Sequence, residues 1–184
     1  MKRQSSFMRG FSESYLADLG RVIAAWSAVE QSFLTLFLSF VVMRGARSGS
    51  LRNERVKTLM GAGLKEQVND FKQRLKELDI TPQKLSAAIS TLDRVHTLRG
   101  ERDRVAHSVF TLSLEDSDDG QVRFAQDEAI ATFISWKKDF TGHDVRPLKQ
   151  TKLKDIFERM DSLYWELANF SLDPELRAQR PRPT

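Results

Sequence analysis

The chain contains no cysteine among its 184 residues. This absence excludes a disulfide framework, a thiolate metal site and a cysteine nucleophile. It also suits a reducing compartment, so we expect a cytoplasmic protein. Histidine and carboxylate residues form no cluster with metal-ligand spacing. We therefore expect chemistry that uses neither a metal nor a cofactor.

Long hydrophobic runs are also lacking. The most apolar segment, Phe33 to Met43, is about half as long as a bilayer span requires. The first ten residues are basic but do not include the apolar run of a signal peptide. We expect this segment to be a core helix rather than a membrane anchor, and we expect no membrane partner.

The residues that are present have the composition of an ordinary globular protein, 40% hydrophobic and 29% charged. A chain of this length can bury a sizeable core as one domain. No internal repeat or linker divides it, so we expect a single domain over residues 12–170 and a flexible tail over 171–184. The net charge of +4 favours anionic partners without identifying one.

Apolar residues recur at helical spacing in four regions, which predicts a mostly helical fold. These regions cover residues 15–43, about 53–78, 82 onward into the segment 101–108, and 151–170. Ser12 or Ser14 can cap the first helix, whereas Gly61 and Gly63 weaken or break the second. Thr81-Pro82 is a strong start signal for the third helix, since proline is favoured at the first helical position.

The periodicity changes to a strand-like alternation after the third helix. Val109–Leu114 and Gln121–Ala125 flank the turn sequence Asp116–Gly120, which predicts a short β-hairpin. Residues 127–140 fit either a further strand or a short helix. The predicted fold class is all-α, a bundle of four to five helices with a small β-hairpin insertion after the third or fourth helix.

Charged and ionisable side chains are concentrated in residues 101–108, Glu-Arg-Asp-Arg-Val-Ala-His-Ser. Arg102 falls seven residues after Val95 and so continues the apolar stripe of the third helix. An unpaired buried charge is costly, so we expect Arg102 to line a cleft or to face a partner surface. Asp103 lies one turn before His107, where its carboxylate can bond to the imidazole and fix the tautomer.

Arg102 and His107 themselves lie about 140° apart on an ideal helix. They converge if the helix frays near His107, if the arginine curls round the helix, or if a second subunit completes the site. Gly100 makes a distortion of the helix credible. Alternatively, the segment is only a charged helix end, where Arg104 and His107 complement the helix dipole.

The segment Arg102-Asp103-Arg104-Val105-Ala106-His107 resembles the Rx4–6H motif of HEPN domains (higher eukaryotes and prokaryotes nucleotide-binding). The pattern Trp26-Ser27-Ala28-Val29-Glu30 on the first helix is similar to one that small bacterial HEPN proteins carry. The likeness covers roughly residues 12–170. It implies a helical bundle that forms a homodimer, with two arginine–histidine motifs around a shared cleft.

The resemblance also implies a function, since active HEPN proteins are metal-independent endoribonucleases, often toxins or anti-phage effectors, that leave a 2′,3′-cyclic phosphate. Carried over, His107 moves the proton of the ribose 2′-hydroxyl, Arg102 holds the scissile phosphate, and Asp103 orients the site. Arg104 and Glu30 would support it, although Glu30 fits a solvent-facing position equally well. The implied partners are RNA, a second copy, and an antitoxin or nucleotidyltransferase.

Two other functional classes stay open. Some HEPN proteins are non-catalytic modules that bind a nucleotide or a partner protein, and a purely structural helical protein would use the charged motif only as a cap. A basic cluster around a glycine–serine loop could steer RNA phosphates or could simply be solvated. Its arginines are Arg44, Arg47, Arg52 and Arg55.

Overall fold

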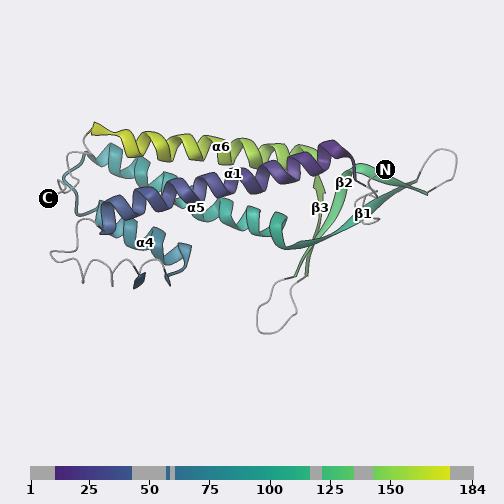
Figure 1. The fold of residues 1–184 in the computed structure, drawn as a ribbon, viewed down its shortest axis with the longest axis horizontal. Helices are drawn as coiled ribbons and strands as arrows, with labels where there is room; N and C mark the ends of the chain where they lie inside the picture. Colours follow the sequence, from purple (N-terminus) through teal and green to yellow (C-terminus); the bar gives the residue numbers. More distant parts are fainter. Residues whose placement is uncertain (1–10, 43–56, 59–60, 117–121, 135–142, 175–184) are drawn as a thin grey trace. The chain divides into compact units, whose positions relative to one another are not determined.

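The computed structural model describes residues 11–42, 57–58, 61–116, 122–134 and 143–174. The fold is mostly helical, as the sequence predicts (Figure 1). In chain order the elements are helix α1 (Glu13–Phe37), the π-helical turn η2 (Leu38–Val42), helix α4 (Leu64–Leu75), helix α5 (Pro82–His107), strands β1 (Ser108–Asp116), β2 (Val122–Ile134) and β3 (His143–Lys149), and helix α6 (Gln150–Leu172).

The helix ends follow the local signals of the sequence. The Ser12 hydroxyl accepts a hydrogen bond from the Tyr15 backbone N–H at 3.1 Å, so Ser12 rather than Ser14 caps α1. Helix α4 begins directly after Gly63, and α5 begins at Pro82. The π-helical turn η2, which directly follows α1, has no counterpart in the sequence prediction.

The strands form one antiparallel sheet with the order β1-β2-β3. The β1–β2 pairing runs from Ser108 opposite Phe133 to Asp116 opposite Val122, and its register shifts between Leu112 and Leu114. The predicted hairpin is therefore present, but its second strand is longer than predicted. Of the two alternatives for residues 127–140, the strand is found as far as Ile134, where β2 pairs with β3. Residues 117–121, which include most of the predicted turn, lie outside the described residues.

The chain divides into two compact units. The first combines Met1–Trp26 with Gly100–Met160, and the second combines Ser27–Arg99 with Asp161–Thr184. The three strands belong to the first unit and α4 to the second, whereas α1, α5 and α6 contribute residues to both. The single domain over residues 12–170 and the flexible tail stay predictions; α6 itself extends to Leu172.

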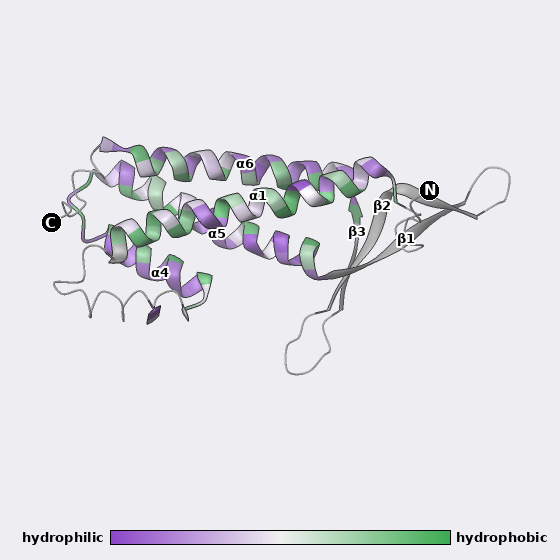
Figure 2. Ribbon diagram, viewed as in Figure 1, coloured by the Kyte–Doolittle hydropathy of each residue, from purple (hydrophilic) through white to green (hydrophobic). Residues whose placement is uncertain are grey.

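The second unit is built around an aromatic cluster. Phe71 of α4 lies at its centre, with ring centroids of its neighbours 5.7–6.5 Å away. These neighbours are Phe33, Phe37, Phe40 and Phe170. Phe71 is fully buried, and purple and green residues alternate along the helices, as amphipathic packing requires (Figure 2).

Polar side chains hold the start of α1 to the start of α6 in the first unit. The buried Tyr15 hydroxyl donates to the Leu148 carbonyl at 2.9 Å, and Gln150 Nε2 donates to the Asp18 carboxylate at 2.7 Å. Arg21 adds a second bond to Asp18 at 2.6 Å. The hydrogen bond from Gln150, assisted by Arg21, holds the pKa of Asp18 below its usual value although burial acts in the opposite direction.

One helix among the described residues is long and apolar enough to cross a membrane by length and composition alone. It spans Glu13–Phe40, with a mean hydropathy of 1.4 over its most apolar window. Core helices of soluble proteins pass the same test. Here the apolar stripe of this helix includes Val29, Phe33 and Phe37, which are buried within the protein.

Candidate functional site

Arg102 takes a position that apolar residues occupy elsewhere on α5. The buried stripe of this helix includes Leu92, Val95 and Leu98 before Arg102 and resumes at Val105 after it. The Arg102 side chain retains 25% of its exposure. Arg102 therefore continues the packing stripe, as predicted, and its charge needs compensation by neighbouring groups.

Two neighbours provide that compensation. Arg102 Nη1 donates to Asp103 Oδ1 at 2.8 Å, and the Arg102 Cζ atom lies over the Trp26 ring, 5.6 Å from its centroid. Among the described residues these are the contacts of the guanidinium. Because a guanidinium carries five N–H donors, most of them stay available to an anion that approaches the exposed part of the side chain.

The expected hydrogen bond between Asp103 and His107 does not form. The Asp103 carboxylate instead accepts from Arg102, its neighbour in sequence. A hydrogen bond between a guanidinium and a carboxylate is among the strong charge-assisted kind, which explains the preference. His107 is exposed and is the last residue of α5. No hydrogen bond to its imidazole is found among the described residues.

Helix α5 is continuous through Gly100 and ends at His107. A side chain at position 100 would meet nothing within 4 Å, so the glycine serves no close contact. Of the three ways in which Arg102 and His107 could converge, a distortion of α5 at Gly100 is therefore not found. On this unbroken helix Arg102 and His107 stay about 140° apart, and Arg102 does not curl toward His107 because Asp103 and Trp26 hold it.

Trp26 is a site residue that the sequence suggested only through the family resemblance. It is 1% exposed, and its Nε1 atom is the one buried side-chain polar atom without a hydrogen-bond partner among the described residues. Helical spacing places Trp26 on the buried face of α1. It does not reveal that Arg102, 76 residues later, lies over the ring.

A second ion pair joins α5 to α6 beside the motif. Arg159 Nη1 donates to both carboxylate oxygens of Glu101, at 2.8 and 3.0 Å. Arg159 also lies 3.6 Å from Asp155, whose pKa is lowered chiefly by a hydrogen bond from Lys152. Sequence reasoning missed the pairing of Arg159 with Glu101, because nothing in the spacing connects residues 58 positions apart.

The remaining predicted site residues have mixed outcomes. Glu30 is half-buried on α1 in the second unit, and Arg104 is exposed on α5 in the first. The four arginines of the basic cluster, Arg44, Arg47, Arg52 and Arg55, lie outside the described residues. The described part of the chain contains no group of three side chains suited to a metal ion.

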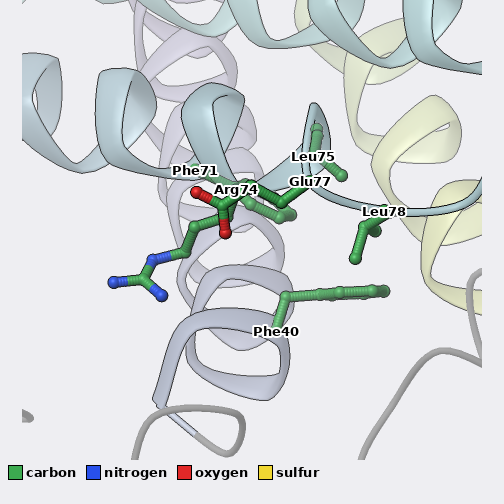
Figure 3. Close-up of a pocket in the computed structure, with 6 residues that line it drawn as sticks. All are labelled: Phe40, Phe71, Arg74, Leu75, Glu77 and Leu78. Carbon is green, nitrogen blue, oxygen red and sulfur yellow. The ribbon is translucent and has the colours of Figure 1, made fainter.

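The second unit contains a small pocket between η2 and α4 (Figure 3). Its walls include the rings of Phe40 and Phe71 and the side chain of Leu78. The Arg74 guanidinium extends away from the Phe40 ring. The pocket volume of about 220 Å³ is below the roughly 300–1,000 Å³ of typical ligand sites, which argues against a substrate site there.

Comparison of the chain with protein-family models, with curated proteins and with solved structures finds no match. Among the described residues, the arrangement of Arg102, Asp103 and Trp26 is the best candidate for recognition of an anion.

Proposed function

We propose that this chain is a metal-independent endoribonuclease of the HEPN type that acts as a homodimer. The observation that carries the proposal is Arg102: a cation on a packing stripe, held by Asp103 and Trp26, with N–H donors left for a phosphate. Its role is to bind the scissile phosphate and to stabilise the charge that develops there during cleavage. A toxin or defence role, with an antitoxin or nucleotidyltransferase partner, belongs to the same proposal.

His107 supplies the proton transfer in this mechanism. The ribose 2′-hydroxyl gives its proton to the imidazole, and the 2′-oxygen bonds to phosphorus. The bond from phosphorus to the 5′-oxygen breaks, and that oxygen takes up a proton. The products are a 2′,3′-cyclic phosphate and a 5′-hydroxyl. The exposed position of His107 at the end of α5 is compatible with access to a ribose.

A second copy of the chain is part of the proposal because of the helix geometry. Arg102 and His107 of one copy diverge by about 140° on the continuous helix α5. With Arg102 held by its two neighbours, the simplest way to bring a histidine to the bound phosphate is to take it from the partner. Each composite site then uses Arg102 of one copy and His107 of the other.

The first experiment measures cleavage of single-stranded RNA in EDTA. Arg102→Ala should lower the rate roughly 10²–10³-fold through loss of a charge-stabilising donor. His107→Ala should lower it roughly 10²–10⁴-fold through loss of acid–base catalysis. Arg99→Ala and His96→Ala are matched controls on the same helix and should change the rate little. Cleavage that survives both site substitutions would contradict the proposal.

The second experiment tests the composite site by mixing the two inactive variants. If arginine and histidine come from different copies, half of the dimers in an equal mixture are mixed and each has one intact site. The mixture should then regain about a quarter of the wild-type rate. Mass spectrometry of the intact dimers shows whether mixed dimers have formed. If they have formed and the cleavage rate does not recover, the site does not combine two copies.

A non-catalytic module that binds a nucleotide or a partner protein is the second candidate function. The observation that favours it is the imidazole of His107, which no carboxylate orients among the described residues. In that case the RNA stays intact in the first experiment. Nucleotide or partner binding would nevertheless be present and would be lost in Arg102→Ala.

A further inference from the structure

Trp26 combines two properties that ordinary packing does not explain. Its indole is almost completely buried, yet its Nε1–H has no hydrogen-bond partner among the described residues. A buried donor without a partner is costly, and phenylalanine would supply apolar surface without that cost. If Trp26 has a role beyond packing, that role should involve the face of its indole ring. The guanidinium of Arg102 lies over this ring.

We infer that Trp26 is a positioning residue for Arg102 and that together they present the guanidinium to a phosphodiester. This inference rests on the proposed role of Arg102 in phosphate binding. Tryptophan has the strongest attraction for a cation of the aromatic side chains, and it attracts the cation to the face of its ring. Trp26 thus holds the Cζ atom of the guanidinium over its ring.

Asp103 completes the positioning from another direction. Its carboxylate accepts a hydrogen bond from Nη1, while the Trp26 ring lies beneath Cζ, so two separate contacts restrain the guanidinium. An arginine side chain normally loses much rotational freedom when it binds a ligand. With two restraints already in place, Arg102 loses less on binding, and its remaining donors keep a fixed direction toward the exposed side.

A double-mutant cycle tests the inference without requiring cleavage. The probe is a single-stranded 2′-O-methyl RNA oligonucleotide, whose blocked 2′-oxygen cannot attack phosphorus. Trp26→Leu should weaken binding about 5- to 10-fold through loss of the cation–π contact, and Trp26→Phe, which keeps an aromatic face, should stay within about threefold of wild type. Trp165→Leu, at a tryptophan that is 57% exposed, is the matched control.

The decisive measurement is the effect of Trp26→Leu in the Arg102→Ala background. A residue that acts through Arg102 has no further effect once that arginine is gone, so the two losses should not add. An equal further loss would overturn the inference, as would unchanged binding by Arg102→Ala alone. If binding follows the expected pattern but RNA is never cleaved, the proposed catalysis fails while the positioning role stands.

A fluorescence measurement keeps the test valid if Trp26→Leu does not fold. In a protein with Trp136→Phe and Trp165→Phe, Trp26 is the sole indole and reports directly on the cation over its ring. Its emission should differ between the Arg102 and Arg102→Ala forms, and saturation with the 2′-O-methyl oligonucleotide should change it only when Arg102 is present. Emission that is identical in the two forms and unresponsive to the oligonucleotide would overturn the inference.

Discussion

The two units differ in the kinds of side chain that they bury. In the second unit the interior is an aromatic cluster around Phe71, and the buried polar side chain Gln67 is uncharged. Its ion pair Arg94–Glu166 lies where both side chains are more than a third exposed. In the first unit Asp18 is 3% exposed, and Arg102 occupies a stripe position of α5. Polar groups in an interior cost stability unless they are paired. The difference teaches that the first unit is the place to look for function, since sequences break packing rules mainly at such sites.

The largest expected effect on stability comes from the second unit. Phe71→Ala removes the central ring of the aromatic cluster and should lower the free energy of unfolding by about 3–5 kcal/mol. Urea denaturation followed by circular dichroism measures this change. Leu172→Ala, at a position 57% exposed, is the control and should cost far less. A loss below about 1 kcal/mol would mean that the cluster does not carry the stability of this unit.

A smaller effect is expected at the buried carboxylate of the first unit. Asp18→Asn weakens the bonds from Gln150 and Arg21 and should lower the free energy of unfolding by about 1–3 kcal/mol at neutral pH. Because the pKa of Asp18 is lowered by folding, the charged form stabilises the protein above the unfolded pKa of about 3.9. That stabilisation disappears as the pH falls through the lower folded pKa.

Urea denaturation of wild type and Asp18→Asn from neutral pH to about pH 2 measures this linkage. The difference between the two proteins should shrink steadily below pH 4 and should be constant above pH 6. Asp161→Asn, at an exposed position of α6, is the matched control. A difference that does not change with pH would show that the charge of Asp18 is not what stabilises the junction of α1 and α6.

The smallest effect should come from the exposed ion pair of the second unit. Arg94→Ala removes the ion-pair partner of Glu166, but both side chains are more than a third exposed. Glu166 also keeps the hydroxyl groups of Thr91 and Ser162 as hydrogen-bond donors. The expected cost is below about 1 kcal/mol and should decrease further at high salt. Thermal denaturation with and without added sodium chloride measures it. A loss as large as that of Asp18→Asn would remove the contrast between the two units.

Much of the helical fold could be predicted because its signals are local. The Ser12 cap, the start at Pro82 and the break at Gly63 each depend on a few adjacent residues. The sheet was harder, since β3 contains Pro147, which usually argues against a strand. The strand order explains the exception: β3 lies at an edge of the sheet, where proline is tolerated.

The site could be predicted only as far as one helix determines it. The stripe of α5 correctly indicated that Arg102 continues the packing face of this helix, where its side chain is 25% exposed. Its partner Trp26 could not be derived from spacing, because packing between distant segments decides which residues meet. The pairing of Asp103 with His107 was predicted from their spacing of one helical turn. The Asp103 carboxylate instead accepts a hydrogen bond from the guanidinium of Arg102.

The direct passage from α5 into β1 limits how this protein can change in evolution. His107 ends the helix and Ser108 begins the strand, with no loop residue between them. A single inserted or deleted residue in the last turn would rotate the helix by about 100° and would also exchange the two faces of β1. Loops usually absorb such length changes. We expect related sequences to keep the spacing from Arg102 through the first strand free of insertions and deletions, even where the residue types differ.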